Sequence, residues 1–117
     1  MAGTRLYSTE ALHTMGGGNK EFIHKMCLIF IAIVPEGIDK IEMAWAVGDI
    51  KTVFQYAHKI KSNINHLGVV SIKEDLLKIE MMAREEKVDA ILMDALILKV
   101  RNTIDEVVGQ IKEDCGV

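Results

Sequence analysis

Residues 49–68 of this chain read DIKTVFQYAHKIKSNINHLG, and they predict the helix on which the fold depends. The apolar side chains of this histidine helix recur at steps of four and three residues, which places them on one face: Val53, Ala57, Ile60, Ile64 and Leu67. Asp49 can cap its start and Gly68 can end it. At about 100° per residue, His58 projects roughly 140° from the centre of the apolar stripe. His58 is therefore expected to face solvent.

The polar residues that follow His58 are suited to binding an anionic group. A neutral imidazole, with an ordinary pKa near about 6.5, is a nucleophile at working pH. Lys61 could compensate the charge of a phosphoryl group on His58, and Asn65, nearly two turns away, could donate a hydrogen bond to it. Ser62 is small and leaves room for a partner protein. We expect no carboxylate, serine nucleophile or second acid or base on this face, so it is predicted to hold a phosphoryl group and not to activate water.

Two helices are predicted before the histidine helix. A short one starts with Ser8 as its cap and ends at the glycines 16–18, because glycine tolerates the backbone of a helix stop. A long one covers residues 20–47, with Asn19 as its cap. Pro35 lies inside the long helix and removes a backbone donor, so a kink or break is expected there.

Two more helices are predicted after it. Ser71 and Glu74 have the spacing of a capping box at the start of the first, which continues to about residue 85. Asp89 can cap the last long helix, and residues 115–117 are expected to be a frayed tail. No alternating strand pattern is present. Four substantial helices with short connections predict an all-α fold, an antiparallel four-helix bundle with a short extra N-terminal helix, as a single domain over residues 1–117.

The composition excludes several classes of protein. Half of the 117 residues are hydrophobic, but the longest apolar run, residues 26–34, is far shorter than the ~20 residues of a membrane-spanning helix. The two cysteines, Cys27 and Cys115, are too few for a disulfide framework and predict thiols in a reducing compartment. The formal net charge of -3 argues against nucleic-acid binding. A cytoplasmic protein with no nucleic-acid or membrane partner is expected.

The sequence around His58 resembles the phosphoacceptor motif of histidine-containing phosphotransfer (HPt) domains. That motif reads Ala-His-x-x-Lys-Gly with a Leu-Gly pair at the helix end, and this chain has Ala57-His58-Lys59-Ile60-Lys61-Ser62 and then Leu67-Gly68. Residues 17–23, 46–49 and 76–80 are also similar to the family, so the resemblance covers nearly the whole chain. One position departs from the motif: Ser62 replaces the usual glycine, and its hydroxyl could bind phosphoryl oxygens or narrow the approach of a partner.

The resemblance implies a phosphorelay intermediate. His58 would accept a phosphoryl group from the aspartate of one receiver domain and pass it to the aspartate of another, with Lys61 and Asn65 stabilising that group. The implied partners are response regulator receiver domains and a hybrid sensor histidine kinase. In this family Mg²⁺ belongs to the receiver. We therefore expect a phosphocarrier, and not an enzyme, that is a monomer and has no cofactor or metal site.

A docking surface for the partner is predicted beside His58. Phe54 lies on the flank of this face, either as packing at the edge of the core or as part of an apolar rim. Gln55, Lys59 and Ser62 belong to the same surface, and Lys59 could steer an acidic partner. His66, displaced by about 80° around the helix, is expected at the rim. It lies too far from His58 for the two to share a metal ion.

Two alternatives stay open. A catalytically silent HPt-like bundle could bind a receiver or a kinase without transferring phosphate, although such a protein is expected to have lost His58 and Lys61. An unrelated helical interaction module, in which the histidine is incidental, is the other. Because the chain is little longer than the fold, we expect a stand-alone HPt protein, with an excised domain of a larger kinase as the other possibility.

Overall fold

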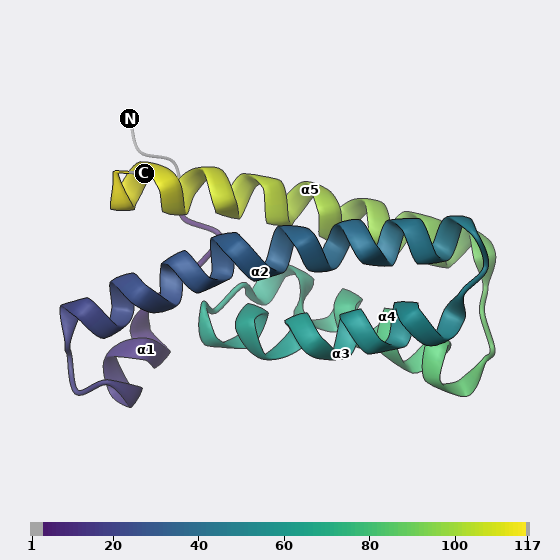
Figure 1. The fold of residues 1–117 in the computed structure, drawn as a ribbon, viewed down its shortest axis with the longest axis horizontal. Coiled ribbons are helices and arrows are strands. Elements are labelled where there is room, and N and C mark those ends of the chain that lie inside the picture. Colours follow the sequence, from purple (N-terminus) through teal and green to yellow (C-terminus); the bar gives the residue numbers. More distant parts are fainter. Residues whose placement is uncertain (1–3, 117) are drawn as a thin grey trace.

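The computed structural model describes residues 4–116, which form five α-helices and one short 3-10 helix. The elements are α1 (Glu10–Met15), α2 (Lys20–Ala46), α3 (Ile50–His66), η1 (Val70–Ile72), α4 (Lys73–Glu85) and α5 (Ala90–Cys115). Helices α2 to α5 run alternately in opposite directions along the long axis of the molecule (Figure 1). The prediction of an all-α, antiparallel four-helix bundle with a short N-terminal helix is confirmed.

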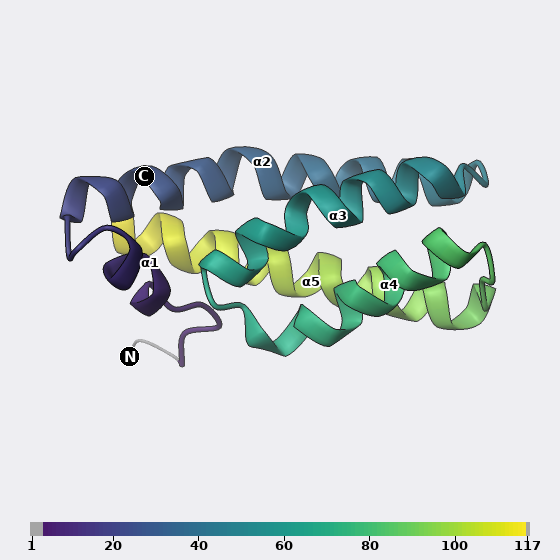
Figure 2. The same cartoon turned by 90° about the horizontal axis from the view of Figure 1, so that it is seen from below.

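The four long helices form a ring in which each contacts two neighbours. Helix α3 packs between α2 and α4, as Figure 2 shows, and α5 contacts α2 and α4 on the other side. All four contribute fully buried side chains to one core, among them Phe30, Ile60, Ile79 and Ile104. The apolar stripe of α3 is buried as predicted, so its polar face is turned to solvent. Among residues 4–116, no helix is both long and apolar enough to cross a membrane.

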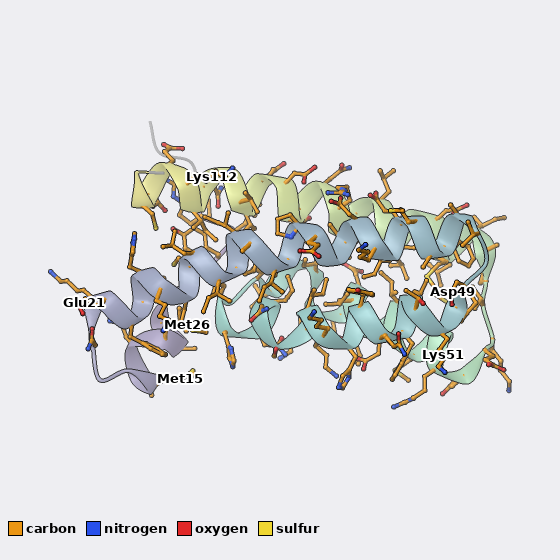
Figure 3. The ribbon with its side chains drawn as sticks, in the orientation of Figure 1. Met15, Glu21, Met26, Asp49, Lys51 and Lys112 are labelled. Atoms are coloured by element: carbon orange, nitrogen blue, oxygen red, sulfur yellow. The ribbon has the colours of Figure 1, made fainter. Side chains whose placement is uncertain are left out.

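Residues 4–8, which precede α1, contact the ends of two long helices at one end of the bundle. The backbone N–H of Ser8 donates to the carbonyl of Leu67, 2.7 Å away, at the end of α3. Arg5 pairs with Asp114 near the end of α5 at 2.6 Å, and the hydroxyl of Tyr7 donates to the same carboxylate. In Figure 3, Met15 of α1 and Met26 of α2 are labelled at this end, whereas Asp49 and Lys51 lie at the opposite end. Residues 4–8 therefore connect the ends of α3 and α5.

Side-chain caps begin three of the helices as predicted. Asn19, Asp49 and Asp89 accept backbone hydrogen bonds in the first turns of α2, α3 and α5. The capping box predicted at Ser71 is wrong, because residues 70–72 form η1 and α4 begins directly after it without a side-chain cap. The 3-10 turn continues into the α-helix, so the first amides of α4 are not left for a serine to bind.

Three other local predictions need correction. Helix α1 has Thr9 at its cap position, although the Oγ of Ser8 still accepts a hydrogen bond from the N–H of Glu10 at 3.2 Å. Helix α2 continues through Pro35, so the predicted break does not occur, while the predicted kink stays a prediction. Helix α5 is regular up to Cys115 and ends at Gly116, whose left-handed backbone (φ 70°) stops the helix. The frayed tail predicted for residues 115–117 is therefore wrong for residue 115, and residue 117 lies outside the described residues.

Two helical glycines offer a matched test of the packing. Gly37 in α2 is buried, and a Cβ atom there would clash with the Cγ2 of the buried Ile60 on α3. Gly109 in α5 is exposed, and a Cβ atom there would meet nothing within 4 Å. Gly37→Ala is expected to lower the free energy of unfolding by about 1–3 kcal/mol. Gly109→Ala should raise it by roughly 0.5–1 kcal/mol through helix propensity. Urea unfolding measures both, and two stabilising substitutions would contradict the close approach of α2 and α3.

Candidate functional site

His58 lies on the solvent-facing side of α3, as predicted. Its side chain is 62% exposed. The opposite face of α3 is buried: Ala57 precedes His58, Ile60 follows it, and both are fully buried in the core. The imidazole therefore faces solvent on a helix whose opposite face is packed into the core.

A carboxylate from α4 contacts His58, contrary to the expectation that this face has none. The Oε2 of Glu80 lies 2.6 Å from the Nδ1 of His58, and its Oε1 lies 2.9 Å from the Nζ of Lys61. The Glu80 side chain is only 5% exposed, whereas that of Lys61 is 35% exposed. The prediction failed because Glu80 belongs to the neighbouring helix, and the pattern of the histidine helix carries no information about it.

Glu80 interrupts the apolar face of α4. Leu76, Ile79 and Ala83 are buried on this face, and Glu80 is buried among them. A buried charge is costly unless it is paired and hydrogen-bonded, and both carboxylate oxygens of Glu80 have a partner. A carboxylate within an apolar stripe was therefore the sequence feature that could have identified this residue.

The charge state of Glu80 decides which nitrogen of His58 carries the proton. Burial raises the pKa of Glu80, but hydrogen bonds from Lys61 and His58 and their charges outweigh it, so this pKa lies below its usual value. An ionised carboxylate only accepts hydrogen bonds, so the Nδ1–H of His58 donates to it. In the neutral imidazole, the lone pair is then on Nε2, on the side of the ring away from Glu80.

Phe54 covers one face of the imidazole. The two ring centroids are 5.8 Å apart and the ring planes differ by 19°. Phe54 is half-buried and packs against the core, which fits the first of the two roles predicted for it. Together, the stacking with Phe54 and the hydrogen bond to Glu80 restrict the orientation of the imidazole.

The remaining residues of the predicted docking surface lie beside this centre. Gln55 and Lys59 are exposed and border an open cavity of about 210 Å³ with Tyr56. The Nζ of Lys59 lies 5.6 Å from the ring centroid of Tyr56. Ser62 is exposed one turn beyond His58. Their contribution to docking stays a prediction.

Asn65 and His66 lie near the end of α3. Asn65 is exposed, about 10 Å further along the helix axis than His58, and lines a cavity of about 80 Å³ that Gly68 also borders. The structure does not place Asn65 in the centre around Glu80, and its role stays a prediction. His66 is half-buried, more than a rim position implies, and its buried Nδ1 has no partner among residues 4–116. Within the same residues, no three His, Cys, Asp or Glu side chains form a group that could hold a metal ion.

The pairing of Glu80 predicts that stability depends on pH. Because the pKa of Glu80 lies below its usual value of 4.5, its contribution is complete above that value and is lost as the pH falls through the folded-state pKa. We expect Glu80→Gln to lower the free energy of unfolding by about 1–2 kcal/mol at pH 7, because His58 and Lys61 can return to water. Urea unfolding should show this difference shrinking as the pH falls below 4.5.

Glu85→Gln, at an exposed position of the same helix, is the matched control and should show no such pH dependence. If Glu80→Gln lowers the free energy of unfolding by the same amount at every pH, the charge of this carboxylate does not stabilise the fold.

Comparison with protein families agrees with this geometry. The Hpt domain family matches residues 25–112, a stretch that contains all of α3 and α4 and most of α2 and α5. No curated protein and no solved structure matches the chain significantly. Hpt domains are histidine phosphotransfer modules of phosphorelays, and they are phosphocarriers rather than catalysts. Because the match covers well more than half of the chain, the chain belongs to the Hpt domain family.

Proposed function

We propose that this protein carries a phosphoryl group on the Nε2 of His58 and relays it between the aspartates of receiver domains. The observation that carries the proposal is the hydrogen bond from Nδ1 to the ionised Glu80. It leaves the lone pair on the Nε2 of a side chain that is 62% exposed. Membership of the Hpt domain family supports the same assignment, because His58 is the histidine that fits the family motif.

In the first step, the lone pair of Nε2 attacks the phosphorus of an aspartyl phosphate. The N–P bond forms as the P–O bond to the aspartate breaks, and the aspartate leaves as a carboxylate. Since Nδ1 keeps its proton, the imidazole acquires positive charge. Glu80, 2.6 Å from Nδ1, compensates that charge.

The same proton assists the second step. When the aspartate of the next receiver attacks phosphorus, the N–P bond breaks and its electron pair returns to Nε2. With Nδ1 protonated the leaving group is a neutral imidazole, whereas without that proton it would be an imidazolate, which is far more basic and leaves less readily. Glu80 therefore supports transfer in both directions by holding the proton on Nδ1.

Lys61 supplies positive charge for the phosphoryl group. An ammonium group has three N–H donors, and one of those of Lys61 is directed to Glu80. The other two are available to phosphoryl oxygens, and the partial exposure of the side chain lets it move towards them. Asn65 and the hydroxyl of Ser62 are proposed as further donors on the same face.

The proposed partners are response regulator receiver domains and a hybrid sensor histidine kinase. Receivers would supply Mg²⁺ and the acidic pocket, and this chain would supply the imidazole and the surface formed by Phe54, Gln55, Lys59, Ser62 and His66. A cytoplasmic location and a monomeric state stay predictions. The silent HPt-like bundle is less well supported, because a module that only binds has no use for a buried carboxylate with its cost of desolvation.

Transfer from a phosphorylated receiver tests the phosphoacceptor. The wild-type protein should acquire an acid-labile, base-stable label, because a phosphoramidate is stable in base and hydrolyses in acid. His58→Gln should acquire none, and His24→Gln, at an exposed position of α2 outside the site, should be labelled like the wild type. Circular dichroism checks that both variants fold. Undiminished labelling of His58→Gln would overturn the site, and an unlabelled wild type with every receiver of a panel would favour the silent bundle.

Single-turnover transfer to and from a receiver tests the role of Glu80. In Glu80→Gln the neutral amide no longer holds the proton on Nδ1. We therefore expect both rates to fall roughly 10- to 100-fold, the loss of about one charge-assisted hydrogen bond. Receiver affinity, measured by titration calorimetry, should change little. A variant that loses affinity but keeps its transfer rate would place Glu80 in docking and not in the transfer step.

A further inference from the structure

We propose that Cys27 and Cys115 are a redox-sensitive pair that forms a reversible disulfide between α2 and α5. Both thiols border one open cavity of about 460 Å³ at the end of the bundle where α1 lies. His58, Lys61 and Glu80 do not line this cavity, and the proposal does not depend on the phosphotransfer function. It is a second site of chemistry in the same chain.

The fold brings these two cysteines together from helices that are far apart in the sequence. Cys27 lies in the N-terminal part of α2 and is buried, and Cys115 is the last residue of α5 and packs, half-buried, against the same core. Helices α2 and α5 are direct neighbours. Burial raises the pKa of Cys27 to about 11, and the neighbouring Cys115 thiol raises it as well. The cavity that both thiols line places them near one another at this end of the bundle.

Two features of the chain keep the pair in place and allow it to adjust. Asp114, next to Cys115, is held by Arg5 and by the hydroxyl of Tyr7. Gly116 ends α5 directly after Cys115, and the last turn of a helix can shift at little cost. Because Cys115 lies in this last turn, it can move towards Cys27 and reach disulfide geometry while the rest of α5 stays in place.

A peroxide is the oxidant that the proposal requires. The Cys115 thiolate attacks one peroxide oxygen, the O–O bond breaks, and the products from hydrogen peroxide are a sulfenic acid and, after protonation, water. The Cys27 thiolate then attacks the sulfenic sulfur, the S–S bond forms, and hydroxide leaves and takes up the proton that Cys27 released. In sum, two thiols lose two electrons and one hydrogen peroxide is reduced to two waters.

The positions of the two thiols assign these roles. Cys115 is the more accessible of the pair and reacts first, whereas the buried Cys27, whose pKa is about 11, is mostly protonated at neutral pH and resolves the sulfenic acid. The disulfide would close a loop that contains most of the chain. It would thus restrict the unfolded ensemble and stabilise the oxidised protein.

Hydrogen peroxide treatment of the whole chain, followed by intact mass spectrometry, tests the proposal. The wild-type monomer should lose two hydrogens and regain them with dithiothreitol. Its melting temperature should rise by about 10 °C on oxidation. Cys27→Ser and Cys115→Ser should show neither change, and peptide mapping of the oxidised wild type should recover a Cys27–Cys115 cross-linked peptide even if a variant does not fold. Stepwise addition of oxygen to Cys115 without a cross-link, or disulfide-linked dimers only, would overturn it.

Discussion

Glu80 is buried under α3, and its two carboxylate oxygens bind His58 and Lys61. A carboxylate in an apolar stripe destabilises the fold unless donors satisfy it, and here both donors come from the neighbouring helix. The alignment of α3 against α4 is therefore fixed by charge as well as by shape. This contact determines which ring nitrogen of His58 carries the proton. It also determines where the Lys61 ammonium lies.

Much of the fold could be predicted because its determinants are local. The stripe from Val53 to Leu67 repeats every three or four residues, and such a repeat specifies both a helix and its buried side. The exposure of His58 follows from the same repeat. Asn19, Asp49 and Asp89 each cap a helix through a contact within three residues, so their caps could also be predicted.

The contacts between helices could not be predicted in the same way. Glu80 meets His58 only because α3 and α4 have particular rotations about their axes, and no spacing within one helix specifies that rotation. The capping box at Ser71 failed for a different reason, since its spacing is compatible with both an α-helix start and the 3-10 turn that forms. The proximity of Cys27 and Cys115 likewise depends on how α2 and α5 pack along their length.

The absence of a side chain at Gly37 has a mechanical consequence for His58, the proposed phosphoacceptor. Ile60, two residues after His58, fills the space that a β-carbon of Gly37 would take, so α3 has no free volume behind it on the side of α2. In the proposed transfer, a receiver that presses on the imidazole would push α3 towards α2, which Ile60 already contacts at Gly37. Because protein interiors have low compressibility, α3 would move little when a partner presses on it. As the proposed nucleophile, the imidazole of His58 would therefore stay nearly fixed while the partner moves towards it.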